Sequence, residues 1–280
     1  METLRTSSAM AARSRALRAE DRVVGFVPTM GALHEGHLSL IRIASALADV
    51  TVVSVFVNPT QFGPTEDFDR YPRDLECDAA LAEAAGCDIL FAPEPADVYP
   101  RGHATVVHVE RMGERLCGAA RPGHFDGVTT VVAKLLNVVR PSLAVFGQKD
   151  GQQLAIVERM VADLNMGVEI IRAPTVREAD GLAMSSRNAY LSAEERREAP
   201  ALYRALREAA ALYEGGERDA RAVVGAVRSL IESGSRAAVQ YVSAVDAATL
   251  EDVAELRPGT MIAVAAHFGG TRLIDNIVLP

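Results

Sequence analysis

The most constraining feature of the sequence is a short apolar run that leads, through a turn rich in glycine and histidine, into an amphipathic helix. Residues 23–27 (VVGFV) are apolar throughout, which is typical of a parallel strand buried on both faces. Residues 28–37 (PTMGALHEGH) form the turn, and the apolar positions between 38 and 43 predict the buried side of a helix. A strand that feeds a helix in this way is the first part of an α/β fold.

The turn itself carries groups suited to nucleotide chemistry. The start of the following helix offers backbone N–H groups and the positive end of a dipole, which favour phosphate. His34 and His37 are three residues apart, so on a helical turn their side chains share a face. A zinc site is the disfavoured alternative, because a zincin helix places its two histidines four residues apart.

Strand and helix patterns then alternate along the chain. Apolar runs predict strands at 51–57, 88–91, 143–146 and 168–171. Helical spacing predicts helices at 74–85, 127–139 and 150–163. This alternation indicates a parallel sheet covered on both faces, and ligands of such sheets bind at the carboxyl ends of the strands. We therefore expect the polar segments 28–37, 58–63 and 147–153 to meet in one crevice.

The pattern changes after about residue 176. A capping box at 192–195 (SAEE) predicts a helix to about Tyr213, and a second helix should follow to about Glu232. Strands are predicted at 239–244, 261–267 and 273–279, with Gly269 and Gly270 as the hairpin turn between the last two. The fold class is thus α/β, with a Rossmann-like parallel-sheet domain at 1–175 and a smaller α+β domain at 176–280.

Composition excludes several classes of function. The chain has 280 residues and a net charge of −8, which argues against a nucleic-acid or anionic-membrane surface. The three cysteines lack metal-ligand spacing, so we expect a reducing, cytoplasmic location. Apolar stretches fall short of the roughly 20 residues that a membrane helix needs. The first twenty residues contain four arginines, faintly like a transit peptide, but a surface helix is favoured.

Each further polar segment has a structural and a functional interpretation. Residues 58–63 (NPTQFG) suit a plain turn, yet Gln61 offers neutral donors and an acceptor to a small polar substrate. Lys149 would lie near a helix dipole, while Asp150 caps that helix, and both interpretations can hold together. Residues 184–188 (MSSRN) could close on phosphate, although taken alone they favour an interdomain linker.

Other polar residues are less informative. Residues 121–127 (RPGHFDG) suit either a lid or a subunit contact, and the sequence leaves both open. His103, His108 and His267 are read as ordinary structural histidines. The acidic stretch 66–69 (EDFD) is expected to be a solvated loop.

Taken together, these polar segments resemble those of a known family, the pantothenate synthetases. The resemblance is carried by residues 28–37, 58–63, 147–150 with Gln152 and Gln153, and 183–188, in the same order and spacing. It runs from about Gly25 to Leu191 and continues more weakly to the C-terminus. His34 to His37 (HEGH) looks like the HIGH motif of class I aminoacyl-tRNA synthetases and other nucleotidyltransferases. Met184 to Arg187 (MSSR) looks like a degenerate KMSKS loop.

The resemblance implies a ligase of pantothenate biosynthesis, in the coenzyme A pathway. Such an enzyme condenses D-pantoate with β-alanine through a pantoyl-adenylate, consumes ATP as substrate with Mg²⁺, and releases AMP and pyrophosphate. It also implies a cytoplasmic homodimer, in which residues 1–175 bind ATP and pantoate and residues 176–280 act as a lid. Metal ligands are not identified by the resemblance, and neither nucleic acid nor membrane is an expected partner.

The resemblance assigns site residues by motif. His37, with His34 and Lys149, is assigned to catalysis. Gln61 and Gln153 are assigned to pantoate, with Gln61 near β-alanine. The ATP-binding assignments are Met30, Gly31, Ala32, Leu33, His34, Glu35, Gly36, His37, Gly147, Gln148, Lys149, Asp150, Val176, Met184, Ser185, Ser186 and Arg187.

Two positions depart from the family pattern, and two rival functions stay open. Position 148 is Gln where many members have Glu, and position 151 is Gly where an aromatic residue is frequent. Gly151 in a first helical turn costs on the order of 1 kcal/mol relative to alanine. The rivals are a nucleotidyltransferase that activates a different acid and a non-catalytic nucleotide sensor.

Overall fold

The computed structural model describes residues 1–64 and 66–280 of the chain, which divides into two compact units. The first unit comprises Met1–Glu114, Gly118–Gly147 and Ile156–Ala173, and the second comprises Arg115–Cys117, Gln148–Ala155 and Pro174–Pro280. The boundary expected at residue 175 lies near the last of these divisions. Residues 115–117 and 148–155 group with the second unit, although the sequence division assigns them to the first domain.

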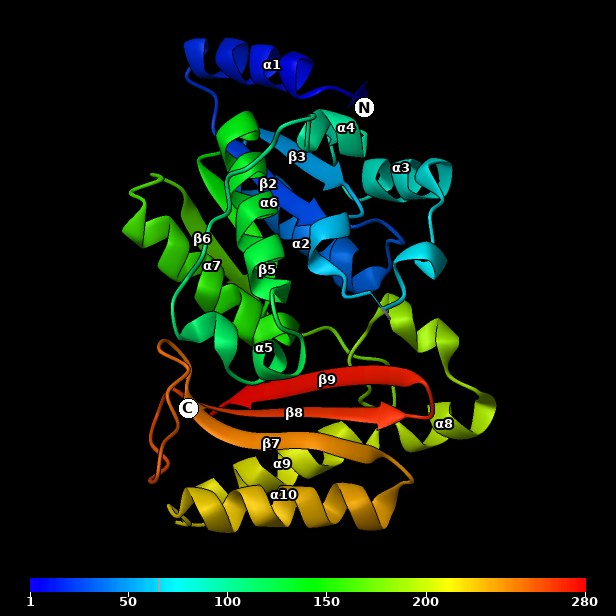
Figure 1. Ribbon diagram of the computed structural model, residues 1–280, viewed down its shortest axis with the longest axis vertical. Coiled ribbons are helices and arrows are strands. Elements are labelled where there is room, and N and C mark those ends of the chain that lie inside the picture. Colours follow the sequence, from blue (N-terminus) through cyan, green and yellow to red (C-terminus); the bar gives the residue numbers. More distant parts are fainter. Residues whose placement is uncertain (65) are drawn as a thin grey trace. The chain divides into compact units, whose positions relative to one another are not determined.

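A parallel sheet forms the centre of the first unit (Figure 1). Across the described residues it has six strands in the order β1-β4-β3-β2-β5-β6. The strands are β1 (Glu2–Leu4), β2 (Val24–Thr29), β3 (Val50–Val55), β4 (Ile89–Phe91), β5 (Leu143–Gly147) and β6 (Glu169–Ala173). The central strand β2 pairs in parallel with both β3 and β5. The five predicted strands and the parallel sheet are confirmed.

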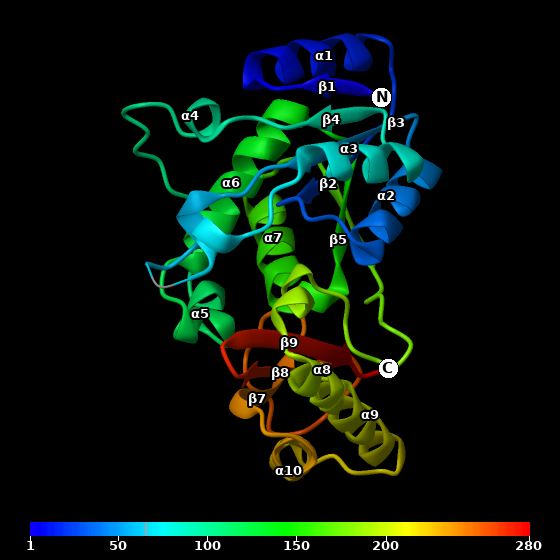
Figure 2. The ribbon, with the colours of Figure 1, turned by 90° about the vertical axis from the view of Figure 1, so that its right-hand side faces the viewer.

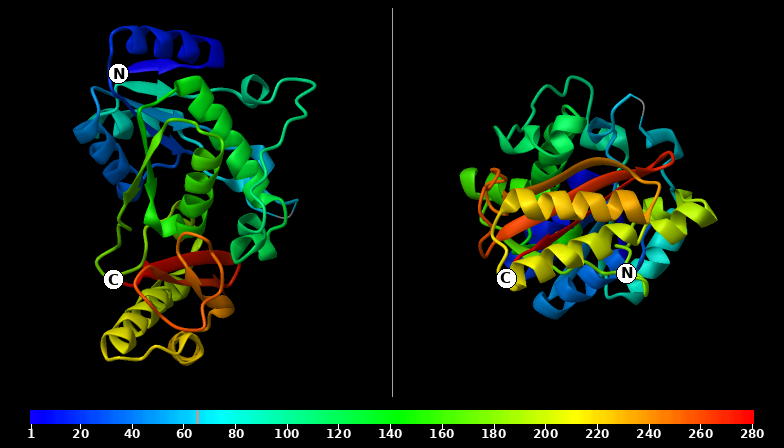
Figure 3. Two further views of the ribbon diagram at one scale, coloured as in Figure 1. Left: turned by 90° about the vertical axis from the view of Figure 1, so that its left-hand side faces the viewer. Right: turned by 90° about the horizontal axis from the view of Figure 1, so that it is seen from below.

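Helices cover both faces of this sheet. The helices of ten residues or more in this part of the chain are α1 (Ser7–Ala19), α2 (Glu35–Leu47), α3 (Leu75–Ala84), α6 (His124–Val139) and α7 (Gly151–Asp163). Figures 2 and 3 show α2 and α3 on one face and α6 and α7 on the other. Shorter turns of helix are α4 (Pro95–Val98), α5 (Cys117–Ala120) and the 3₁₀ turns η1 (Pro59–Gln61), η2 (Phe68–Arg70), η3 (Met112–Glu114), η4 (Gln148–Asp150) and η5 (Ser186–Tyr190).

The N-terminal segment is built into this unit. Strand β1 pairs with β4, so that Thr3 lies opposite Leu90. Helix α1 buries Met10 and Leu17 and contacts α6. The favoured interpretation, a helix leading into the first long strand, is confirmed. The sequence did not predict β1, because three residues are too few to show an alternating pattern.

The core of the first unit explains why the apolar runs become strands. Val27, Val53, Leu90 and Val145 lie on neighbouring strands, are at most 1% exposed, and pack with Ile41 of α2. Burying a side chain of this size stabilises the fold by about 1.5–3 kcal/mol. These contacts hold the strands in register and thereby fix where each strand ends.

The second unit is the expected smaller α+β domain. Its antiparallel sheet has the order β7-β8-β9, and its strands are β7 (Ala238–Asp246), β8 (Thr260–Phe268) and β9 (Thr271–Val278). The predicted hairpin at Gly269 and Gly270 is confirmed, with φ of +55° at Gly269 and Phe268 paired with Thr271. Helices α9 (Ala201–Glu214) and α10 (Ala220–Gly234) pack against each other and the sheet (Figures 1 and 3).

One helix prediction in this unit was wrong. The capping box at Ser192 and Glu195 is present, but the helix that it opens, α8 (Ala193–Glu198), ends after six residues. Pro200 is then the N-cap of α9, which begins at Ala201 as a separate helix. Proline has no N–H to donate to the preceding turn, so a continuous helix from 193 to 213 would lose a hydrogen bond at this point. Among the helices of the described residues, none is long and apolar enough to cross a membrane.

The close approach of α6 to η1 generates a stability prediction. A Cβ atom at Gly127 of α6 would lie 2.4 Å from the carbonyl oxygen of Thr60, which is a backbone atom. Gly127→Ala should therefore lower the free energy of unfolding by about 1–3 kcal/mol, because α6 and η1 must separate. Equilibrium urea denaturation measures the change.

A matched control is Gly225→Ala in α10, where a Cβ would meet nothing within 4 Å. At this exposed helical position alanine should stabilise the protein, by up to about 1 kcal/mol. Equal effects of the two substitutions would contradict the packing argument.

Candidate active site

The loop that follows β2 is held by a carboxylate from a distant helix. Asp78 of α3 accepts hydrogen bonds from the backbone N–H groups of Ala32, at 3.0 Å, and Leu33, at 2.7 Å. The loop needs this support, because Gly31 and Ala32 both have positive φ angles, of 83° and 50°. Burial raises the pKa of Asp78, and its two backbone donors oppose that shift.

Thr29 ties the same loop to the neighbouring strand. Its hydroxyl donates to the carbonyl oxygen of Ser54 at 2.7 Å and accepts from the N–H of Gly31 at 3.1 Å. The turn that was predicted to cradle phosphate is therefore anchored at both of its flanks. Asp78 carried no local signal in the sequence, where it is one polar residue within a predicted helix.

His34 and His37 lie together at the start of α2. His34 is the N-cap of the helix, and its Nδ1 accepts from the N–H of Gly36 at 3.1 Å. The centroids of the two imidazole rings are 4.1 Å apart, so the predicted shared face is confirmed. Two imidazoles at a helix N-terminus can donate hydrogen bonds to an anion beside them, and this terminus itself favours negative charge.

The segment after β3 brings Gln61 and Met30 together. The Nε2 of Gln61 lies 3.1 Å from the sulfur of Met30, and its Oε1 accepts from Nδ2 of Asn58 at 2.9 Å. Asn58 is buried and also donates to the carbonyl oxygen of Gly127 at 3.1 Å. The Oδ1 of Asn58 in turn accepts from the hydroxyl of Tyr99 at 2.8 Å. Two residues assigned by motif to ATP and to pantoate are thus neighbours.

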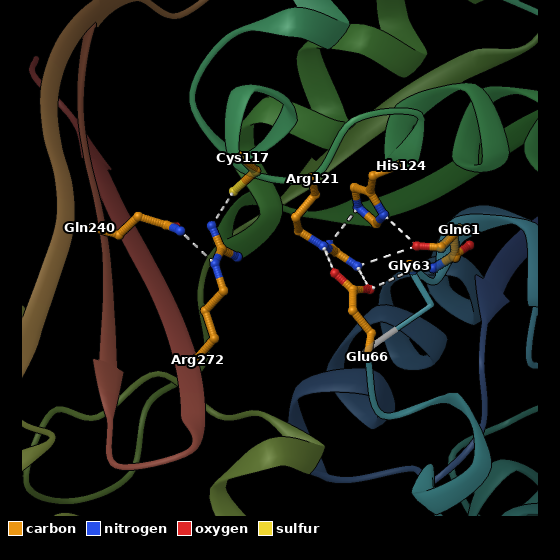
Figure 4. A network of polar contacts seen from close by, with 8 residues as sticks. All are labelled: Gln61, Gly63, Glu66, Cys117, Arg121, His124, Gln240 and Arg272. Carbon is orange, nitrogen blue, oxygen red and sulfur yellow. Dashed lines mark hydrogen bonds and ion pairs between the residues drawn. The ribbon is translucent and has the colours of Figure 1, made fainter.

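A cluster of side chains that the sequence did not predict holds the backbone of Gln61 (Figure 4). Arg121 binds Glu66 through two contacts of 2.6 Å, and its Nη1 lies 2.8 Å from Nε2 of His124. The Nδ1 of His124 lies 2.7 Å from the carbonyl oxygen of Gln61. A guanidinium can only donate, so Nε2 accepts and the proton of the neutral ring is on Nδ1, which donates to Gln61.

This cluster corrects one prediction and adds to another. The stretch 66–69 was expected to be a solvated loop, but the Glu66 side chain is 24% exposed and bound to Arg121. Burial alone would raise the pKa of Glu66, and the hydrogen bonds and charge of Arg121 outweigh it, so the pKa is lowered. Residues 121–127 therefore support Gln61, a role that was not among the two alternatives considered.

In the second unit, the turn η4 carries Lys149. Its ammonium lies 3.6 Å from a carboxylate oxygen of Asp150, and its side chain is 22% exposed. Gln152 is buried, where its Oε1 accepts from the N–H of Cys117 at 2.9 Å and its Nε2 donates to the carbonyl oxygen of Arg115 at 2.7 Å. Gln152 is thus a structural residue, whereas Gln153 beside it is half-buried.

Cys117 is the centre of a further set of contacts in the second unit (Figure 4). Arg272 donates to its sulfur at 3.2 Å and to Oε1 of Gln240 at 3.0 Å. The hydroxyl of Tyr241 lies 3.1 Å from the same sulfur. Burial is the main cause that raises the pKa of the Tyr241 hydroxyl, and the neighbouring Cys117 is the second. Within the second unit, these contacts join Cys117 to residues of β7 and β9.

The segment around 176–188 is more ordered than a plain linker. The N–H of Met184 donates to the carbonyl oxygen of Val176 at 3.0 Å, and Arg177 pairs with Ala183 in an antiparallel bridge. This small hairpin makes Val176 and Met184 neighbours. Ser185 caps η5 by accepting from the N–H of Arg187 at 3.3 Å.

Glu66 gives the pH prediction for this region. Because its pKa is lowered in the folded state, the ionised Glu66 carboxylate stabilises that state. This contribution is complete at pH values above the pKa of a glutamate in the unfolded chain, near 4.5. That contribution should be lost as pH falls through and below this value. The free energy of unfolding of Glu66→Gln should consequently depend less steeply on pH than that of the parent between about pH 5 and 3.

The partner residue provides the control. Arg121→Gln should abolish or reverse this pH dependence, because burial then raises the pKa of Glu66, and adding Glu66→Gln to it should restore the profile of Glu66→Gln alone. Parallel pH profiles for the parent and Glu66→Gln, measured by urea denaturation, would show that the pair is not linked to folding.

Comparison with known proteins covers almost the entire chain. Residues 2–278 match the family model described as pantoate-beta-alanine ligase. The pantothenate synthetase of Acetivibrio thermocellus is 54% identical over 279 residues, covering 100% of this chain and 99% of the relative. That of Moorella thermoacetica is 53% identical over 279 residues, with the same coverage.

Solved structures agree with the sequence matches. The crystal structure of pantothenate synthetase from Thermus thermophilus has a TM-score of 0.95 and 47% identity, and covers 100% of both chains. The pantoate-beta-alanine ligase from Francisella tularensis, solved in complex with beta-gamma ATP and beta-alanine, has a TM-score of 0.81 and 33% identity, covering 99% of this chain and 97% of that one. The expectation from the motifs is confirmed: the chain belongs to the pantoate-beta-alanine ligase family of enzymes.

Proposed function

We propose that this enzyme condenses D-pantoate with β-alanine to form pantothenate, through a pantoyl-adenylate, with release of AMP and pyrophosphate. Membership of the family along the whole chain supports the overall reaction. The observation that best supports adenylate chemistry is the pair of imidazoles, 4.1 Å apart, at the N-terminus of α2. The relative from Francisella tularensis, solved with a form of ATP and with β-alanine, supports the choice of substrates.

In the first step the pantoate carboxylate attacks the α-phosphorus of ATP. A bond forms between a carboxylate oxygen and phosphorus, and the bond from phosphorus to the pyrophosphate oxygen breaks. Two anions must meet, so their repulsion has to be cancelled. In our proposal the residues that donate to the phosphates are His34, His37, Lys149, Ser185, Ser186 and Arg187.

Known magnitudes show that these groups are sufficient. One preorganised donor at a developing charge is worth roughly 3–4 kcal/mol. Holding two reactants in line removes roughly 7–11 kcal/mol of barrier. Together these effects accelerate the step without a covalent enzyme intermediate.

Gln61 and Gln153 are proposed to bind pantoate as neutral partners. A cation in their place would hold the attacking carboxylate more strongly and make it a weaker nucleophile. The side chain of Gln61 is oriented by Asn58 and Met30, and its carbonyl by His124. The enzyme therefore presents Gln61 in one conformation, which lowers the entropic cost of binding pantoate.

Mg²⁺ fits this donor set as an ion held largely by the substrate. Within residues 1–64 and 66–280, no group of three or more His, Cys, Asp or Glu side chains is arranged to hold a metal. Mg²⁺ commonly uses one or two carboxylates together with phosphates and water. Asp150, beside Lys149, is a carboxylate that would serve, and the ion would neutralise charge on the leaving phosphates.

In the second step the amine of β-alanine attacks the acyl carbon of the adenylate. The new bond joins nitrogen to carbon, the bond from carbon to the phosphate oxygen breaks, and AMP leaves. An acyl-adenylate hydrolyses in water, so exclusion of water matters. We propose that residues 184–188 provide it by closing on the bound nucleotide, with residues 176–280 as the lid domain.

The reaction is tested by mixing ATP, D-pantoate and β-alanine with the enzyme and measuring AMP, pyrophosphate and pantothenate. Mass spectrometry of a mixture without β-alanine should detect pantoyl-adenylate. A panel of other small acids in pyrophosphate exchange tests the choice of pantoate. Release of ADP and orthophosphate, or stronger activity with another acid, would contradict the proposal.

Two of the phosphate donors give the sharpest prediction. His37→Ala and Lys149→Ala should each slow pantoate-dependent ATP–pyrophosphate exchange by at least ~10²-fold, because each removes a donor to a developing charge. Circular dichroism and thermal unfolding should show an intact fold. Near-normal exchange in either folded variant would remove that residue from the catalytic set.

Gln61→Ala should act on pantoate rather than on ATP. We expect it to raise the Michaelis constant for pantoate by about 10-fold, in line with the loss of one or two neutral hydrogen bonds, and to leave that for ATP within about 2-fold. Gln240→Ala, at an exposed glutamine of the second unit, is the matched control. An unchanged constant for pantoate would place Gln61 outside the site.

We further propose that the enzyme is a cytoplasmic homodimer that acts on small molecules and binds neither nucleic acid nor membrane. The family resemblance supports the dimer and the location. Light scattering coupled to size-exclusion chromatography tests the dimer, for which a mass near twice 29.9 kDa is expected. A mass of one chain at micromolar concentration would contradict it.

A further inference from the structure

Asn276, on the last strand, has every polar group of its side chain engaged with the turn that carries Lys149. Its Nδ2 donates to the carbonyl oxygens of Gln148 and Lys149, at 2.9 Å each. Its Oδ1 accepts from Nε2 of Gln148 at 3.0 Å. The side chain is buried, with the residue 5% exposed. An amide has two N–H donors and an oxygen, so this geometry matches asparagine specifically.

These bonds fix the direction in which Lys149 leaves the backbone. The two carbonyl groups that Asn276 binds lie on either side of the Cα of Lys149, so both flanking peptide planes are held. A misplacement of about 1 Å at a catalytic group can slow a reaction by up to about 10²-fold. Support of a catalytic side chain by its neighbours is therefore worth measurable activity.

Gly151 provides the room for this arrangement. A Cβ atom there would lie 2.7 Å from the sulfur of Met261, 3.0 Å from Nε2 of Gln148 and 3.2 Å from Nδ2 of Asn276. A methyl group at 151 would thus require the end of Met261 and the two amides to shift. The same geometry explains Gln148, because an ionised glutamate has no N–H to donate to Oδ1 of Asn276. Gln148 and Gly151 are thus both compatible with the contacts of Asn276.

The preceding residue on β9 anchors a second predicted ATP segment. Asp275 is buried and binds Arg177 through contacts of 2.6 and 3.0 Å. Arg177 also donates to the carbonyl oxygen of Gly181 at 3.1 Å and stacks on Tyr203, 3.6 Å from the ring centroid. Arg177 is next to Val176 in the small hairpin. Neighbouring residues of one strand therefore support the two segments, one on each side.

We propose that Asn276 is a positioning residue for adenylate formation, which acts through the Gln148–Lys149 backbone in the space that Gly151 leaves open. The inference rests on the proposed function, because it takes Lys149 to be the group that is positioned. Asn276 itself does not touch the reacting atoms in this proposal.

The direct test is Asn276→Asp, which keeps the size of the side chain but replaces both donors with a carboxylate oxygen facing two carbonyls. We expect pantoate-dependent ATP–pyrophosphate exchange to fall by about 10-fold or more. We also expect the Michaelis constant for ATP to rise more than that for pantoate. The control is Asn165→Asp, which adds the same charge at an exposed asparagine and should leave exchange unchanged.

Gly151→Ala tests the proposal while keeping Asn276 itself unsubstituted. It decides the question if Asn276→Asp does not fold. Helix propensity alone predicts that alanine stabilises α7 and leaves activity unchanged. The proposal predicts slower exchange and a higher Michaelis constant for ATP, because the methyl group displaces Gln148 and Asn276. Normal exchange in Gly151→Ala, or in folded Asn276→Asp, would overturn it.

Pantoate-dependent exchange in the unsubstituted enzyme distinguishes a failure of this proposal from a failure of the proposed function. Absence of pantoate-dependent exchange in the parent would refute the function itself. Exchange in the parent that either folded variant retains in full would refute the positioning role alone.

Discussion

The parallel pairing of β2 with β3 and β5 is the constraint on which the rest of the structure depends. Pro28 lies opposite Ser54, and Gly25 lies opposite Leu143, so the three strands run side by side in one direction. Their carboxyl ends leave the same edge of the sheet, which is where ligands of such sheets bind. Burial of valine and leucine on both faces fixes the register, and thereby the start of each loop.

The loops beyond that edge are held by polar side chains from distant parts of the chain. Asp78 fixes the turn after β2, His124 fixes the backbone of Gln61, and Asn276 fixes the turn that carries Lys149. A loop with positive φ angles would otherwise populate many conformations. Buried or half-buried hydrogen bonds select one of them, so the groups proposed to meet ATP and pantoate are preorganised within each unit.

Local pattern was sufficient to predict most of the elements but not the hydrogen bonds that hold the loops in place. The strand around Val27 and the hairpin at Gly269 each have a signature a few residues long, and both were predicted. Pro200 also carried a readable signal, since proline divides an otherwise helical stretch, and the predicted long helix overlooked it.

The supporting residues have no such signature, because their partners lie far away in the sequence. Asp78 is 46 residues from Ala32, Glu66 is 55 from Arg121, and Gln148 is 128 from Asn276. A carboxylate within a predicted helix, or an acidic pair in a predicted loop, looks the same whether or not a distant donor meets it. The motif residues were found through their resemblance to a family, which encodes long-range arrangement that a single sequence does not.

The central claim is that the enzyme activates the carboxylate of pantoate by transferring the adenylyl group of ATP to it, with release of pyrophosphate. The most direct measurement uses D-pantoate labelled with ¹⁸O in both carboxylate oxygens, with AMP analysed by mass spectrometry after turnover with β-alanine. The oxygen that joins phosphorus stays with the phosphate when the amine attacks carbon, so AMP should carry one ¹⁸O atom. Unlabelled AMP, or ¹⁸O recovered in orthophosphate, would contradict the claim.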